Sequence, residues 1–223
     1  MSGTILDKNM FSYLNGIPEP IAEYYNIDSP FSVKNRPIYY MPLGKMSYNN
    51  KEETFKKYIP MLKKLMNKYK NQKGIIHTTT FELQNWVQEK IQSDRFLSHS
   101  SDQGSKNFAL KQHYTSDKPT ILLSPSMGTG IDLKNKRARF QICLKMPYPS
   151  LADLKNKRRM KDKPEWYSWV TVSKLIQMYG RAVRNKDDNA HFIILDGNFS
   201  NILRYNSHFI PHWIQKAIKQ VNV

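Results

Sequence analysis

The sequence predicts an α/β fold, with a mainly parallel sheet covered by helices on both faces. The main observation is that short apolar runs of strand length alternate with longer amphipathic stretches from Arg36 onward. Strands that alternate with helices are typical of parallel sheets, because each crossover helix packs on a face of the sheet. The length of 223 residues suits one large domain, or one domain with an extension.

The elements follow from apolar spacing and turn residues. Residues 1–36 predict a short helix followed by a turn-rich loop. Predicted strands are 37–42, 73–78, 95–100, 120–126, 138–147 and 191–196. Predicted helices are 8–14, 55–69, 81–91, 106–113 and 165–184. In a sheet of this kind ligands bind beyond the carboxyl ends of the strands, so the turns after these strands are the informative ones.

Two local features refine the helices. Pro60 lies within the helical spacing of residues 55–69, and it predicts a kink or a break there, because proline lacks the backbone donor. Thr79 and Glu82 predict a capping box at the start of the following helix.

The charge favours a polyanionic partner. Lys and Arg number 35 against 18 Asp and Glu, which gives a formal net charge of +17. Nucleic acid is the simplest partner for such an excess. A compositional bias toward Lys and Asn is the alternative explanation.

Cysteine and histidine content limits metal chemistry. A single cysteine, Cys143, excludes an internal disulfide and any four-cysteine zinc or iron–sulfur site within this chain. The six histidines show no metal-ligand spacing, so we predict no metal site. The N-terminus lacks the features of a signal peptide, and no apolar run approaches membrane-spanning length. We therefore expect no membrane association and a soluble intracellular protein, cytoplasmic or, outside bacteria, nuclear or virus-associated.

The segment "QMYGRAVR" places Gln177, Arg181 and Arg184 at positions i, i+4 and i+7. On a helix these positions share one face. A solvated basic stripe is the plain interpretation. A phosphate clamp is the functional one, because planar guanidinium groups suit phosphate oxygens.

The turn "SPSMGTGIDL" follows the strand 120–126 and combines glycines, hydroxyls and one carboxylate. Gly128 and Gly130 allow a sharp bend or a close approach to a ligand. Asp132 is placed to accept from a ribose hydroxyl or to orient an arginine. The alternative is a glycine turn in which Asp132 caps a helix.

Together these segments resemble superfamily 2 helicases. "QMYGRAVR" matches the Gln-x-x-Gly-Arg-x-x-Arg motif, "SPSMGTGIDL" resembles motif V, and "KGIIHTTTFEL" resembles motif IV. Their order resembles the second RecA-like motor domain of the XPD/DinG branch, over residues 36–200. "MSGTIL" resembles motif III, which closes the first motor domain. The resemblance thus divides the chain into a remnant and connector at 1–36 and a RecA-like helicase C-terminal domain at 37–223.

The resemblance implies a role for each motif residue. Gln177, Arg181 and Arg184 would face ATP across the cleft between two motor domains, and Gly130, Asp132 and Gly180 would line the nucleotide side. Contacts to single-stranded DNA would come from His77, Thr78, Thr79, Ser124, Ser126, Met127 and Thr129. Many relatives carry Glu where Thr129 stands, so the usual coupling between ATP and DNA is not assumed for this chain.

The nucleotide-holding half is not encoded here. The segment "MPLGKMS" has Met46 after Gly44-Lys45, where a P-loop needs Ser or Thr, and no Asp-Glu-x-His box is present. ATP and Mg²⁺ would be held mainly by a first motor domain in the same or another chain, and the isolated chain should be inactive. The alternative function is a non-enzymatic nucleic-acid-binding module derived from a helicase half. The basic run 154–169 is either a strand-binding segment or a solvated helix followed by core aromatics.

Overall fold

The computed structural model describes residues 4–18, 21, 23–47 and 49–222. Within them, seven parallel strands form one sheet in the order β3-β4-β2-β5-β6-β1-β7. The strands are β1 Ile38–Gly44, β2 Gly74–His77, β3 Phe96–Ser98, β4 Ile121–Ser124, β5 Phe140–Cys143, β6 His191–Asp196 and β7 Ile218–Gln220. The predicted α/β class and its parallel sheet are confirmed.

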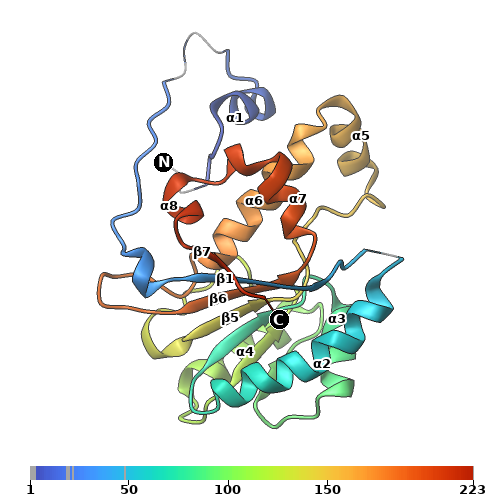
Figure 1. The fold of residues 1–223 in the computed structure, drawn as a ribbon, viewed down its shortest axis with the longest axis vertical. Coiled ribbons are helices and arrows are strands. Elements are labelled where there is room, and N and C mark those ends of the chain that lie inside the picture. Colours follow the sequence, from blue (N-terminus) through green and yellow to red (C-terminus); the bar gives the residue numbers. More distant parts are fainter. Residues whose placement is uncertain (1–3, 19–20, 22, 48, 223) are drawn as a thin grey trace.

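Helices cover both faces of the sheet (Figure 1). α2 Lys51–Lys68 and α3 Phe81–Lys90 pack on one face. The other face carries α4 Gln103–Thr115, α6 Glu165–Tyr179, α7 Phe199–Tyr205 and α8 His212–Gln215. α1 Lys8–Asn15 and α5 Leu154–Asp162 lie outside these layers (Figure 1). In this view β1 runs from left to right, so the carboxyl ends of all the strands point to the right.

Of the kink or break predicted at Pro60, the break is wrong. α2 continues through Pro60 as a single helix of 18 residues. The side chain of Pro60 is exposed, so water can solvate the carbonyl that loses its partner. Tyr58 and Leu62 on either side are fully buried, and their packing against the sheet stabilises the helix across the proline.

Two predicted helix ends also move. Thr80, not Thr79, is the N-cap of α3, and its hydroxyl accepts from the amide of Leu83 at 3.2 Å. α6 ends at Tyr179, where Gly180 is the C-cap and its amide donates to the carbonyl of Ile176 at 2.9 Å. The predicted helical face shared by the glutamine and both arginines is therefore wrong, because the arginines lie beyond the helix.

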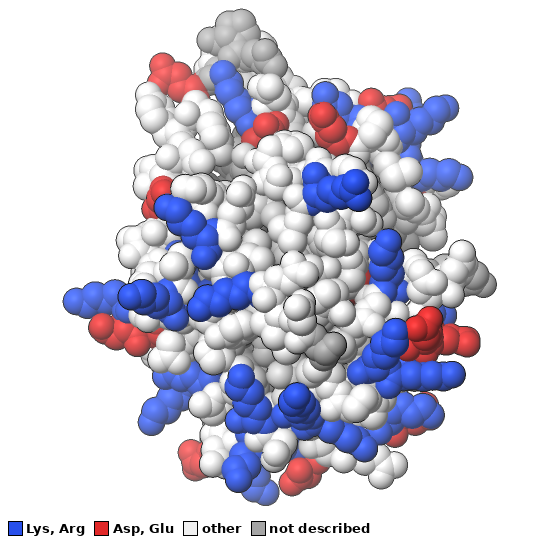
Figure 2. Space-filling view, viewed as in Figure 1, with Lys and Arg blue, Asp and Glu red and all other residues white. Residues whose placement is uncertain are grey.

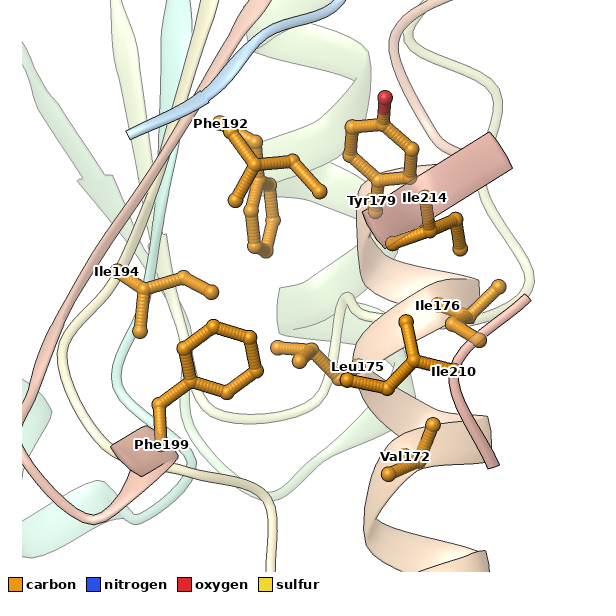
Figure 3. A pocket seen from close by; sticks show the side chains of 10 residues that line it. Val172, Leu175, Ile176, Tyr179, Phe192, Ile194, Phe199, Ile210 and Ile214 are labelled. Atoms are coloured by element: carbon orange, nitrogen blue, oxygen red, sulfur yellow. The ribbon is translucent and has the colours of Figure 1, made fainter. Parts of the chain in front are cut away.

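The layer between α6 and the sheet is almost fully packed. A void of about 10 Å³ remains, and only apolar side chains and the ring of Tyr179 line it. Phe192 and Ile194 of β6 face Leu175 and Ile176 of α6 across it (Figure 3). A space of this size barely reaches the volume of one water and offers it no partners, so the void is a packing gap and not a ligand site.

Candidate functional site at the carboxyl edge of the sheet

The turns after β2, β4, β5 and β6 meet at one edge because these strands are parallel neighbours. His77 is in register with Ser124 of β4 and with Cys143 of β5, and Cys143 is in register with Ile194 of β6. Residues that directly follow these strands therefore share one rim. Most of the predicted site residues lie on this rim or on the turn that extends from it.

The turn after β4 depends on its two glycines. Gly130 has a φ of +73°, a conformation that side chains rarely adopt. A Cβ on Gly128 would lie 2.6 Å from Cγ of Met178, so glycine allows the turn to contact α6 closely. The predicted sharp bend and close approach are present, and the approach is to the protein's own helix.

Arg181 fastens this turn to the end of α6. Its Nε donates to the carbonyl oxygens of Gly128 and Gln177 at 3.0 and 2.9 Å. Its Nη1 donates to the carbonyl of Ile131 at 3.0 Å. Partial burial, and then the charge of Arg184, lowers the pKa of the Arg181 guanidinium. Nη2 forms no hydrogen bond with the described residues, so one edge of the group stays open to a ligand.

Arg184 is held much more loosely. Its side chain is 43% exposed, and Nε lies 3.7 Å from Oδ1 of Asp132. Asp132 also lies 3.7 Å from Nζ of Lys134 and accepts from the amide of Lys134 at 3.3 Å. Of the roles predicted for Asp132, the geometry matches the orientation of an arginine. Arg184 is thus a solvent-accessible guanidinium with one weak ionic contact.

Gln177 faces the N-terminal segment of the chain. Its Nε2 donates to Oγ1 of Thr4 at 3.1 Å, and Ser173 on the preceding turn of α6 donates to the carbonyl of Thr4 at 3.4 Å. Nε1 of Trp169 donates to the carbonyl of Ile5 at 3.0 Å. Residues 1–3 of the motif III-like stretch lie outside the described residues. Its threonine nevertheless contacts the glutamine of the arginine segment, a pairing that no spacing rule indicated.

Several of the side chains predicted to contact single-stranded DNA lie beneath the surface. His77, Thr78, Ser124 and Met127 are each at most 2% exposed. Oγ of Ser124 bonds Nε2 of His99 at 2.6 Å and accepts from the amides of Ser126 and Met127. Its hydroxyl is therefore fully used within the fold. A nucleic-acid strand on this rim would contact the exposed neighbours of these residues, and not these four side chains directly.

His77 begins a buried polar chain across the sheet. Its Nε2 donates to Oε1 of Gln141 at 3.2 Å, and Nε2 of Gln141 donates to the carbonyl of Tyr179 at 3.0 Å. Burial lowers the pKa of His77 to about 4, against the opposing effect of the Gln141 bond. His77 is thus a neutral structural histidine at neutral pH.

Ser126 and Thr129 are exposed at the rim, and Thr79 beside them is half-buried. They border a hollow of about 240 Å³ that Lys174 and Tyr148 also line. Thr79 has a φ of +60°, which is unusual for a β-branched residue, and its Oγ1 has no hydrogen-bond partner among the described residues. Backbone strain and a buried, unpaired hydroxyl therefore coincide directly before the N-terminus of α3.

A second hollow of about 750 Å³ adjoins the first and shares Thr79, Tyr148 and Lys174 with it. Its other lining residues include Lys145 and Ser150 after β5, Tyr167 of α6, and Asn198, Asn201 and Asn206 around α7. Apart from Tyr167, which belongs to the run 154–169, sequence reasoning missed these residues. The available signal was the polar and aromatic turn "KMPYPS" after one predicted strand and "DGN" after another.

Asp196 ties three of these turns together. Its carboxylate accepts from the amide of Met46 after β1, of Met146 after β5 and of Asn198 after β6, at 3.1, 2.8 and 2.9 Å. Burial raises the pKa of Asp196, and the three amide bonds oppose this shift. Sequence reasoning did not single out this residue, because a lone aspartate at a strand end gives no motif.

The basic run 154–169 forms a solvated helix followed by a core aromatic, as its second interpretation predicts. α5 carries the basic residues and buries none of its side chains, whereas Trp166 is 4% exposed in the core. Arg159 lies over the ring of Trp166 at 5.7 Å. On the visible face, Lys and Arg side chains gather mainly over the lower helices, with fewer Asp and Glu among them (Figure 2).

No group of three His, Cys, Asp or Glu residues in the described part of the chain is arranged to hold a metal ion. None of the helices in the same residues combines the length and the apolar character needed to cross a bilayer. The predicted absence of a metal site stays a prediction.

The sequence profile of the helicase C-terminal domain family matches residues 61–217. A search of curated protein sequences found no match. Among solved structures, Xpd4 of S. tokodaii is 17% identical, aligns over 92% of this chain and 42% of its own, and has a TM-score of 0.62. A structure titled XPD helicase is 17% identical over 100% of this chain and 42% of its own, at 0.65.

The C-terminal domain of the DEAD-box protein Dbp5 is also similar. It is 15% identical, aligns over 86% of this chain and 92% of its own, and has a TM-score of 0.55. At these identities the likeness concerns the fold, and it confirms the predicted RecA-like architecture. The chain spans about two fifths of the length of the XPD structures that it matches.

Proposed function

Because this chain belongs to the helicase C-terminal domain family, we propose that it is the second motor half of an XPD/DinG-like DNA helicase. In this proposal it completes an ATP site whose other parts lie on a first RecA-like motor domain. The family supports an ATP-dependent helicase in general. The arginine role and the strand contacts are the specific content of the proposal.

The observation that carries the proposal is the unequal bonding of the two arginines. Arg181 makes three hydrogen bonds to backbone carbonyls through Nε and Nη1, while Arg184 is 43% exposed beside Asp132. A guanidinium that its own fold does not use is suited to a phosphate presented by another domain. Arginines supplied across such an interface raise the rate of phosphoryl transfer by about 10³ to 10⁵.

The residues present fit part of an ATP site. Arg184 would donate to phosphate oxygens, Asp132 would orient it, and the open Nη2 of Arg181 would add a donor. The described residues offer no cluster of carboxylates for Mg²⁺, and Gly44-Lys45 lacks the following Ser or Thr. ATP and Mg²⁺ are therefore assigned mainly to the first motor domain. When bound there, ATP supplies the phosphoryl group whose hydrolysis drives translocation.

Single-stranded DNA is assigned to the rim beside α3. Ser126 and Thr129 are exposed there and offer their hydroxyls to a ligand. The first amides of α3 add donors and the positive end of a helix dipole. A backbone phosphate suits this combination of hydroxyls and amides.

The test is steady-state ATP hydrolysis with single-stranded DNA. It compares this chain alone, a cognate first motor domain carrying a P-loop, and the two together. We expect no turnover from this chain alone and DNA-stimulated turnover from the pair. A pair that associates and binds DNA but hydrolyses no ATP would instead favour the non-enzymatic nucleic-acid-binding module.

A further inference from the structure

The larger hollow beside the rim contains polar side chains that the fold leaves unpaired. It measures about 750 Å³, within the range of ligand pockets in proteins. Asn198, Asn201 and Asn206 line it, and no hydrogen bond joins their side-chain amides to other described residues. Each amide carries donors and an acceptor, so together they can match a ligand edge that has both.

An aromatic platform forms part of the same wall. Tyr148 and Tyr167 both line the hollow, and their rings stack with centroids 5.1 Å apart and planes 17° apart. Burial raises the pKa of Tyr148 to about 12, so its ring is neutral at physiological pH. A stack of two rings leaves an outer face on which a third flat ring can continue.

The charged side chains that line the hollow are both positive, and the carboxylate of Asp196 lies buried beneath it. Lys145 and Lys174 line it, and neither forms an ion pair with a described residue. No Asp or Glu is among the described lining residues. An anionic ligand with a flat polar ring therefore fits better than a cationic or a purely apolar one.

We infer that this hollow binds one unstacked base of a single-stranded nucleic acid that passes along the rim. The base extends the Tyr148–Tyr167 stack, the amides around α7 bond its edge, and Lys145 and Lys174 contact the flanking phosphates. Single strands are recognised in this way, by stacking on aromatic rings and by hydrogen bonds to exposed base edges. The inference rests on the proposed function, and it adds a base-reading site to a track that otherwise contacts only the backbone.

The test is fluorescence anisotropy with the full chain. The probes are short labelled oligonucleotides of thymidine, deoxyadenosine or deoxycytidine, and an abasic strand of the same length. Tyr148→Leu removes the ring, and Tyr148→Phe restores it. Asn201→Leu removes an amide from an exposed helical position, and Asn67→Leu is the matched change on the outer surface of α2.

The wild type should prefer base-bearing strands over the abasic strand. Tyr148→Leu should reduce that preference about fivefold or more, because about fivefold in affinity is the lower end of the range for stacking one base. Tyr148→Phe should retain the preference. Asn201→Leu should narrow the affinity differences among the three bases, and Asn67→Leu should leave them unchanged.

Two negative results are distinguishable. If all variants bind and keep the preference of the wild type, the base site is wrong while the proposed track survives. If the folded wild type binds no strand, base-bearing or abasic, both the base site and the proposed DNA track on this domain are wrong.

Discussion

The corner around Arg181 and the hollow beside Tyr148 lie on one edge of the sheet, but they use their polar groups in opposite ways. At the corner, the donors of Arg181 engage carbonyls of the glycine turn and of α6. In the hollow, three amides and two lysines line an open space without protein partners. The first arrangement is typical of a structural clamp, and the second is typical of a surface that binds a ligand.

This difference separates residues that hold the site in shape from residues that are available to bind a ligand. Buried polar groups need their hydrogen bonds to remain stable, so removing one of them costs stability. Exposed groups contribute little to folding, and their removal should instead change ligand binding or turnover. The following changes test that division.

The largest stability effect is expected at Asp196, beneath the hollow. Asp196→Ala leaves two buried amides and one partly buried amide without their acceptor, and we expect the free energy of unfolding to fall by about 3 to 5 kcal/mol. Urea denaturation followed by circular dichroism measures this change. The exposed Asp187→Ala is the control, and it should stay within about 0.5 kcal/mol. A loss below about 1 kcal/mol for Asp196→Ala would show that the carboxylate is not a structural tie.

Arg181→Ala should cost less, about 2 to 4 kcal/mol, because the carbonyls that it leaves are only partly shielded from water. Arg184→Ala should change stability by less than about 0.5 kcal/mol, since its ion pair is long and exposed. The same denaturation experiment compares the two. Equal losses of stability in the two variants would contradict the distinction between a structural Arg181 and an Arg184 that the fold does not need.

His77 gives the stability a pH dependence. Its pKa is lowered to about 4 in the folded chain, while an unfolded histidine titrates near 6.5. Between these values the unfolded chain binds more protons, so stability falls as the pH drops from about 6.5 to 4.

The contribution is up to about 1.4 kcal/mol for each pH unit in this window. His77→Gln keeps a donor for Gln141 but cannot titrate, so its stability should decline less steeply than that of the wild type. Unfolding curves at several pH values measure the two slopes. Identical slopes would mean that folding does not lower the pKa of His77.

The smallest effect is expected at Lys174. Lys174→Ala should leave stability unchanged within about 0.5 kcal/mol. It should reduce the slope of log K against log salt for single-stranded DNA by about 0.7, the value for one phosphate contact. Lys64→Ala on the exposed surface of α2 is the control, with no change in slope expected. An unchanged slope for Lys174→Ala would remove this lysine from the DNA track.

The fold was predictable because apolar periodicity dominates it. The strands around Ile75, Leu122 and Ile193 are short fully apolar runs, and burial explains them directly. The errors arise where tertiary contacts override local rules. Packing of Tyr58 and Leu62 carries α2 through Pro60, and α6 ends before Arg181, which bonds the glycine turn.

The site was predictable only in part. Motif spacing indicated Arg184 and Asp132, which lie together in the fold. It did not indicate Asp196, Tyr148 or Asn201, because their proximity depends on which strands are neighbours. Spacing also cannot distinguish an exposed hydroxyl from a buried one, so Ser124 was grouped with Ser126.

The central claim is that Arg184 serves a phosphate held by another domain. The direct measurement is kcat for ATP hydrolysis by the assembled pair at saturating single-stranded DNA, for wild type, Arg184→Ala and Lys134→Ala. Lys134 contacts the same carboxylate and is the matched loss of one positive charge. We expect Arg184→Ala to lower kcat by about 10³ or more, with association and folding intact, and Lys134→Ala to lower it by less than about threefold. A kcat for Arg184→Ala equal to that for Lys134→Ala would contradict the claim.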